Sequence, residues 1–168
     1  LAQAEPYRPP VASASDRSVA VIGGGPTGLA AAWFLRRQGH AVELFDRHAS
    51  PGGSLRILEE SELPHHVLAA ELAGVLALGV RFHGGEDLGR TLELPVLSRR
   101  HDAVVLAVGE GAKADGAALG VPLTEHGIAA DPNTCLTALP GVFAAGAAVK
   151  PVKHLVRVGV GWHAIQIG

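Results

Sequence analysis

Short apolar runs separated by turn residues predict that this chain folds around buried strands. Residues 18–22 form a β-branched apolar run, which is typical of a fully buried strand. Helix-forming residues follow from Leu29 to Gln38, and Gly39 favours a helix stop. A second apolar run extends from Val42 to Phe45. A strand, a helix and a strand in this order predict a βαβ unit, which requires a right-handed crossover and a parallel sheet.

The remaining pattern extends this α/β alternation. Apolar residues at helical spacing predict a helix over residues 64–78, and residues 80–83 alternate as a short strand. Residues 92–97 are ambiguous because Pro95 interrupts them. Further strands are predicted at Asp102–Val108, Gly127–Asp131 and Gly141–Gly146, and a closing helix at Val152–Ile165. We predict a single Rossmann-like α/β domain over 18–168, with a parallel sheet, flanking helices and an extended, proline-containing linker over 1–17.

Composition and charge exclude several classes of protein. A chain of 168 residues that is 48% hydrophobic and 18% charged is not disordered as a whole. The net charge of −2 provides no strong basic field, so no nucleic-acid partner is expected. No apolar run approaches the roughly 20 residues that span a bilayer. The first residues lack the apolar core of a secretory signal, so we expect a cytoplasmic protein without membrane insertion.

Few residues are available for metal or thiol chemistry. The chain has a single cysteine, Cys135, which excludes a disulfide framework, a cysteine-based zinc site and a self-contained iron–sulfur cluster within it. His65 and His66 are adjacent, and adjacent residues on a helix point about 100° apart. We therefore expect no metal site, and no catalytic set stands out.

A glycine motif carries the main chemical signal. Gly23, Gly25 and Gly28 follow a predicted buried strand and open a predicted helix. In this context the first glycine permits a tight turn, the second lets a pyrophosphate approach the backbone, and the third lets the helix pack on the strand. The N–H groups and partial positive charge of the helix N-terminus attract phosphate. The alternative is a glycine-rich turn without a ligand.

Asp46 ends the second predicted strand, at about the spacing expected for the acidic partner of such a motif. A carboxylate at this position can accept hydrogen bonds from both ribose hydroxyls of an adenosine. The same charge repels a 2′-phosphate. The sequence therefore favours an unphosphorylated adenosine ribose over that of NADP.

Five ordered segments carry a family resemblance. Residues 19–32 resemble the FAD-binding start of the glutamate synthase small-subunit-like branch of the pyridine nucleotide–disulfide oxidoreductase superfamily. The other four are residues 44–47, 50–56, 102–109 and 140–147, which resemble the ribose strand end, the flavin-side loop, the Ala-Thr-Gly strand and the late flavin motif of that family. The resemblance implies FAD as the cofactor. Together with the glycine motif, it assigns the cofactor to Gly23, Gly25, Pro26, Thr27, Gly28, Asp46, Arg47, Gly53, Ser54, Arg56, Ala107, Gly109, Gly146 and Ala147.

The chain departs from the family pattern at two kinds of place. Ala147 stands where the family has an aspartate that hydrogen-bonds the ribityl chain, and Val108 replaces the threonine of the Ala-Thr-Gly turn. The family also inserts a complete NAD(P)H-binding domain before the late flavin motif, whereas only residues 110–139 lie there in this chain. That stretch holds barely one βαβ unit and no second glycine motif.

These features lead to one leading hypothesis and two alternatives. The chain is interpreted as an FAD-bearing electron-transfer subunit or domain that is not active alone. Its flavin would exchange electrons with partner oxidoreductase subunits that supply a nicotinamide site, iron–sulfur clusters or both. The first alternative is a degenerate, non-catalytic assembly module with the same fold, and the second is an NAD-binding enzyme. Bound flavin would separate the first hypothesis from the others.

Overall fold

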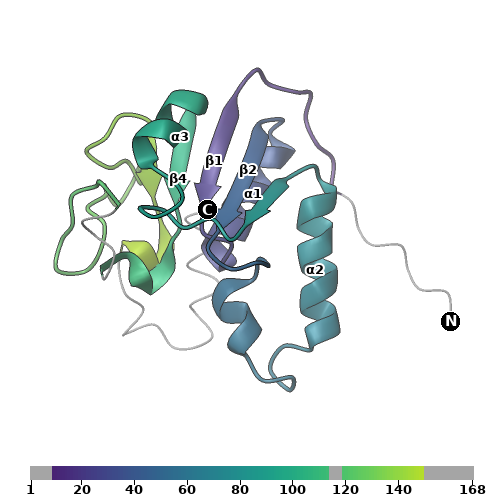
Figure 1. Cartoon of the computed structure of the whole chain (residues 1–168). Coiled ribbons are helices and arrows are strands. Elements are labelled where there is room, and N and C mark those ends of the chain that lie inside the picture. The colour runs from purple at the N-terminus through teal and green to yellow at the C-terminus, as the bar shows by residue number, and fades with distance from the viewer. Residues whose placement is uncertain (1–8, 114–118, 150–168) are drawn as a thin grey trace, which may run out of the picture.

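The computed structural model describes residues 9–113 and 119–149, and in this part of the chain five strands form one parallel sheet (Figure 1). The strands are β1 (Ser18–Ile22), β2 (Ala41–Asp46), β3 (Arg81–Gly84), β4 (Ala103–Leu106) and β5 (Val142–Ala144). Their order across the sheet is β3-β2-β1-β4-β5, with every pair of neighbours parallel. The predicted Rossmann-like α/β fold is confirmed.

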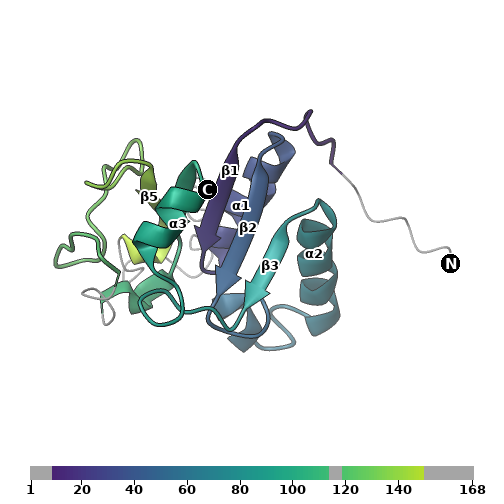
Figure 2. The same cartoon turned by 45° about the horizontal axis from the view of Figure 1, so that its top comes forward.

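Helices cover both faces of this sheet. The α-helices are α1 (Pro26–Arg37), α2 (His65–Ala77) and α3 (Leu94–Arg100), and the short 3₁₀ helices are η1 (Gly53–Ile57), η2 (Gly109–Lys113) and η3 (Gly146–Ala148). Figures 1 and 2 show α2 and α3 on opposite sides of the strands. None of the helices in the described ranges has the length and apolar character needed to cross a membrane.

Two apolar cores explain why β1 is hydrophobic at nearly every position. Val19 and Val21 point to one face, where they pack in a core with residues of α1 and α2. Ala20 and Ile22 point to the other face, where the core includes Leu94 of α3. A strand that is buried on both faces loses the usual alternation of apolar and polar residues and reads as a continuous apolar run.

The structure resolves the ambiguous segment and corrects one predicted strand. Pro95 lies in the first turn of α3, where a proline does not break a helix, so this segment is helical. The strand predicted over residues 127–131 is wrong, because the chain there makes only isolated antiparallel bridges, one of them between Ala130 and Thr137. Asp131 accepts hydrogen bonds from the backbone N–H groups of Asn133 and Thr134, which turns the chain where the strand was expected to continue.

The ends of the chain are only partly described. Residues 9–17 form neither helix nor strand, yet they hydrogen-bond to the end of α1: the Ala12 N–H donates to the Arg37 carbonyl at 2.8 Å. The Ser15 hydroxyl lies 2.6 Å from His40 Nδ1. This part of the predicted linker therefore packs on the domain. The closing helix predicted over residues 152–165 lies outside the described residues.

Asp102 ties the start of β1 to the start of β4 and leads to a pH prediction. The Ser18 N–H donates to its carboxylate at 2.8 Å and the Arg17 guanidinium at 3.1 Å, and these bonds lower the pKa of Asp102. Because the folded-state pKa lies below the unfolded one, the stabilisation is present above the unfolded pKa and is lost as the pH falls through the folded pKa. We expect the free energy of unfolding to decrease below about pH 4, and to do so less steeply in Asp102→Asn. Urea denaturation at a series of pH values measures both slopes, and equal slopes would contradict this assignment.

Candidate functional site

The order of the strands places a crevice at their carboxyl ends. From β1 the chain proceeds to β2 and β3 on one side, and it then returns to β4 and β5 on the other. In open parallel sheets, ligands bind outside the carboxyl ends of the strands at such a switch point. Here the loops that flank the switch point are residues 23–25 after β1 and residues 107–109 after β4.

Two of the three glycines of the motif, Gly23 and Gly28, are required by the protein itself. Gly23 has a φ of +106°, and a Cβ there would collide with the Ala107 carbonyl oxygen at the end of β4. A Cβ on Gly28 would collide with the Gly23 carbonyl oxygen and would lie 3.4 Å from Val21 Cγ1. These two glycines therefore let the loop pass β4 and let α1 approach β1 closely.

Gly25 is different, because nothing in the described protein requires a glycine there. Its φ of −78° is open to any residue, and a Cβ would have no heavy atom within 4 Å. Gly25 caps α1 without a side-chain hydrogen bond, and the first turn of the helix contains no acidic residue. The positive end of the helix dipole thus faces open space that a Cβ at position 25 would partly fill.

Two further segments, far away in the sequence, meet this loop. The Gly52 N–H donates to the Gly24 carbonyl at 2.7 Å, and a Cβ on Gly53 would lie 2.8 Å from Gly25 Cα. From the other side, a Cβ on Gly146 would collide with the Thr27 hydroxyl at the start of α1. The predicted flavin-side loop therefore contacts the glycine loop, and the predicted late motif contacts the first turn of α1.

Asp46 is buried beside the same loop, at the end of β2. Its side chain is 7% exposed, and Oδ2 accepts the Gly24 N–H at 2.5 Å. Oδ1 accepts the His48 N–H at 2.7 Å and lies 2.8 Å from the His48 ring Nδ1. A buried carboxylate needs such partners. Three donors thus fix its orientation next to the glycine loop.

A small cavity opens at Asp46 and shows residues that sequence reasoning missed. Besides Gly23, Asp46 and Arg47, which the sequence identified, it is lined by Ile22, Phe45, Glu86, Asp87, Leu88, Val108, Ala112 and Leu119. Most of these residues follow the carboxyl ends of β3 and β4, and Ile22 is the last residue of β1. Ligands bind outside the carboxyl ends of parallel strands, and applying this rule to the residues after β3 could have found Glu86 and Asp87. Nothing in the sequence pattern indicates that Leu119 packs there.

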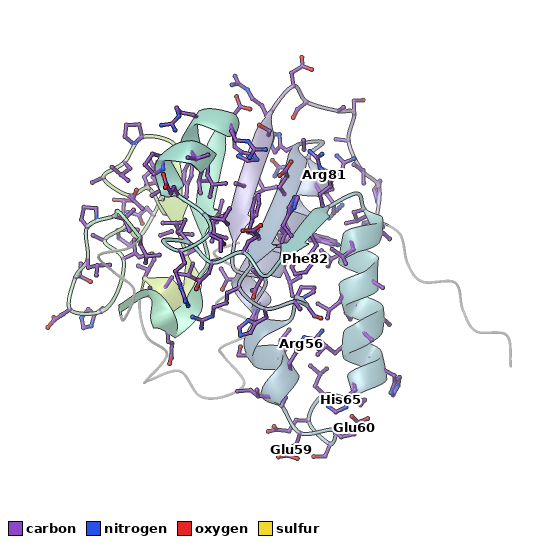
Figure 3. All side chains as sticks on the ribbon, viewed as in Figure 1. Arg56, Glu59, Glu60, His65, Arg81 and Phe82 are labelled. Atoms are coloured by element: carbon purple, nitrogen blue, oxygen red, sulfur yellow. The ribbon has the colours of Figure 1, made fainter. Side chains whose placement is uncertain are left out.

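The other predicted residues lie around the same crevice, with side chains in different settings. Arg56 extends from η1, and Figure 3 shows it on the segment that leads to Glu59 and Glu60. Its Nε donates to the Pro51 carbonyl at 2.7 Å, so the guanidinium is engaged with its own loop. Ser54 is exposed, and Ala147 is half-buried in η3. Within the described ranges, no group of three or more histidine, cysteine or acidic side chains is arranged to hold a metal ion.

The chain matches known proteins over this region. Residues 21–74, which contain the glycine loop and Asp46, match the family of NAD(P)-binding Rossmann-like domains. The chain is 35% identical to YgfK of Escherichia coli O157:H7, over 92% of this chain and 14% of YgfK. It is 38% identical to the NAD-dependent dihydropyrimidine dehydrogenase subunit PreT from the same organism, over 64% of this chain and 25% of PreT. It is 40% identical to the glutamate synthase [NADPH] small chain of Azospirillum brasilense, over 61% of this chain and 22% of that protein. The chain thus spans about a quarter or less of these relatives.

Solved structures agree with the fold. FprA of Mycobacterium tuberculosis, in complex with NADPH, superposes with a TM-score of 0.51 at 20% identity, over 67% of this chain and 25% of FprA. THI4 of Thermovibrio ammonificans superposes with a TM-score of 0.54 at 17% identity, over 81% of this chain and 79% of THI4. At these identities the likeness establishes the Rossmann-like architecture alone.

Proposed function

We propose that this chain binds FAD in the crevice at the N-terminus of α1 and acts as an electron-transfer module of a larger oxidoreductase. The observation that carries the proposal is the convergence at Gly25. The glycine loop, residues 52–53, Gly146 and Asp46 meet at the N-terminus of α1, where nothing in the described part of the chain requires residue 25 to be a glycine. A pyrophosphate is the ligand that such a loop accepts, through backbone N–H groups and the helix dipole.

The contacts favour FAD over NAD as the occupant. NAD would need only the contacts to adenosine and pyrophosphate, which the glycine loop and Asp46 provide. The other two segments would then have no ligand to contact. Residues 52–53 pack on the glycine loop and Gly146 packs on Thr27 in the first turn of α1, and in the family that the sequence resembles both segments serve the flavin half. In this assignment Gly25, Thr27 and Gly28 hold the pyrophosphate and Asp46 holds the adenosine ribose. The bound flavin would supply the electron-transfer chemistry, while the chain supplies binding and orientation.

We further propose that residues 18–168 form an FAD domain without a pyridine nucleotide domain of its own. The described residues between β4 and β5 pack onto the same core as the sheet, because Leu119, Val121 and Ile128 are buried together with Val104 and Val142. Electrons would then come from a nicotinamide site or an iron–sulfur cluster elsewhere in the complex. The names of PreT and the glutamate synthase small chain, a subunit and a chain of oxidoreductases, support this role.

The experiment that tests the proposed function is cofactor release. The full chain is purified with its natural partners, the complex is denatured, and the supernatant is analysed for FAD, FMN and NAD by chromatography with fluorescence detection. We expect about one FAD per chain, and a visible spectrum that bleaches on reduction with dithionite. Absence of FAD from a complex that contains the intact chain would favour an assembly module. NAD in its place would favour the nicotinamide enzyme.

Asp46 leads to a prediction about the ribose. Its carboxylate lines the same cavity as Glu86 and Asp87, so the acidic side chains of the lining outnumber its one guanidinium, that of Arg47. We expect ADP to bind at least about tenfold more tightly than 2′-phospho-ADP, which differs from it only in the 2′-phosphate, because like charges repel. Asp46→Asn removes one negative charge and should reduce the ratio of the two ligand affinities severalfold, as measured by isothermal titration calorimetry. A thermal melt checks that the variant is folded, and an unchanged ratio in a folded variant would contradict the role of Asp46.

A further inference from the structure

The contacts of Asp46 leave one acceptor position open. An ionised carboxylate offers about four acceptor positions, two on each oxygen. The His48 N–H and the His48 ring nitrogen occupy Oδ1, and the Gly24 N–H occupies one position on Oδ2. Among the residues that the structure describes, the remaining position is therefore on Oδ2, the oxygen on the side of the glycine loop.

The ring of His48 approaches Asp46 from outside the cavity. Asp46 and Arg47 line that cavity, and His48 is not among the residues that form its wall. The His48 side chain is 62% exposed, whereas that of Asp46 is 7% exposed. Because a carboxylate only accepts hydrogen bonds, the ring nitrogen at 2.8 Å must carry the proton. This bond adds to the two backbone bonds and restrains rotation of the carboxylate.

We propose that His48 is a positioning residue, which turns Oδ2 of Asp46 towards a ribose hydroxyl of the bound nucleotide. The inference rests on the proposed nucleotide site and adds a residue that acts on the ligand only through Asp46. The ring holds Oδ1 in place, and because the carboxylate is planar this also restrains the direction in which the open acceptor position of Oδ2 points. Without the ring, only the two backbone bonds from Gly24 and His48 hold the carboxylate, so its rotation about the Cβ–Cγ bond is less restrained and the hydroxyl meets a less well-positioned acceptor.

The test compares two ligands that differ only in their hydroxyls. The probes are ADP and 2′,3′-dideoxy-ADP, titrated calorimetrically into the full chain, its His48→Ala variant and its His48→Asn variant. We expect wild type to prefer ADP by about tenfold, as a hydrogen bond to a charged group allows. His48→Ala should reduce this preference about threefold, mainly through weaker ADP binding, because the bond it removes is largely exposed. His48→Asn should restore it, since the amide nitrogen can stand where ring Nδ1 stands.

The outcomes separate this inference from the proposed function. If His48→Ala weakens both ligands equally, the ring has only a structural role and the inference is wrong. An unchanged preference in His48→Ala, or no recovery in His48→Asn, overturns it as well. If wild type binds neither ligand, the nucleotide site itself fails and the inference fails with it. If wild type binds both ligands equally, the site survives but the assignment of Asp46 to the ribose does not.

Discussion

Alanine at position 28 is expected to lower the free energy of unfolding by about 2–4 kcal/mol, since overpacking against a rigid neighbour is among the most damaging substitutions. The added Cβ would collide with the Gly23 carbonyl oxygen. Both atoms belong to backbone that is held by β1 and by α1, so neither can move without separating the helix from the strand. Urea denaturation of wild type and Gly28→Ala measures the difference directly.

The matched control for this substitution is Gly74→Ala. Gly74 lies inside α2, it is exposed, and a Cβ there would have no heavy atom within 4 Å. Alanine in a helix interior is favoured over glycine by about 0.8–1 kcal/mol, so this variant should be slightly more stable than wild type. If Gly28→Ala unfolds at the same urea concentration as Gly74→Ala, the claim that the close approach of α1 to β1 requires glycine at position 28 is wrong.

Valine at position 25 is expected to abolish nucleotide binding while leaving the fold in place. The backbone of Gly25 is extended, with a φ of −78° and a ψ of −173°, and a Cβ there would have no heavy atom within 4 Å apart from its chain neighbours, so the Cβ of a valine fits the described protein without a clash. The loss of stability should stay below about 1 kcal/mol, the difference between glycine and an aliphatic residue at a helix N-cap. A pyrophosphate over the loop would meet the new side chain, so affinity for FAD and for ADP should fall by a factor on the order of 100 or more.

Titration of flavin fluorescence measures this effect, and urea denaturation shows that the variant is folded. Gly74→Ala serves again as the control and should bind FAD as wild type does, because Gly74 lies in α2, away from the loop. A folded Gly25→Val protein with unchanged affinity would show that the ligand does not approach this loop. Together with Gly28→Ala, the pair separates a glycine that the fold requires from a glycine that the ligand requires.

The fold could be predicted largely because β1, α1 and β2 follow local rules. A strand that is buried on both faces, a glycine loop and a run of helix-forming residues that a glycine follows leave strong signals in sequence, and the right-handed crossover then determines the parallel pairing. The glycine loop and Asp46 could be proposed as a site for the same reason, since both lie at fixed places in one βαβ unit. The contact of Gly146 with Thr27 agrees with the order of the motifs.

Other features depend on contacts that are distant in sequence. Pro95 reads as a helix breaker until its place in the first turn of α3 is known. The segment around Ala130 has the composition of a strand, but the turn that Asp131 makes leaves it with isolated bridges. The two bonds from His48 to Asp46 depend on how the chain turns after β2, which no apolar pattern reports. Local pattern therefore predicts where the elements lie, whereas tertiary contacts decide which groups remain available to a ligand.

The central claim is that FAD binds at the N-terminus of α1, where the glycine loop, residues 52–53 and Gly146 meet. The most direct test is a titration of the isotope-labelled chain with FAD, followed by amide NMR. The account predicts saturable shifts of the amides of Gly25, Thr27, Gly28 and Gly53, and weaker shifts in the exposed turns of α2. Saturable shifts confined to other parts of the chain, or no shifts at a concentration that saturates flavin fluorescence, would contradict it.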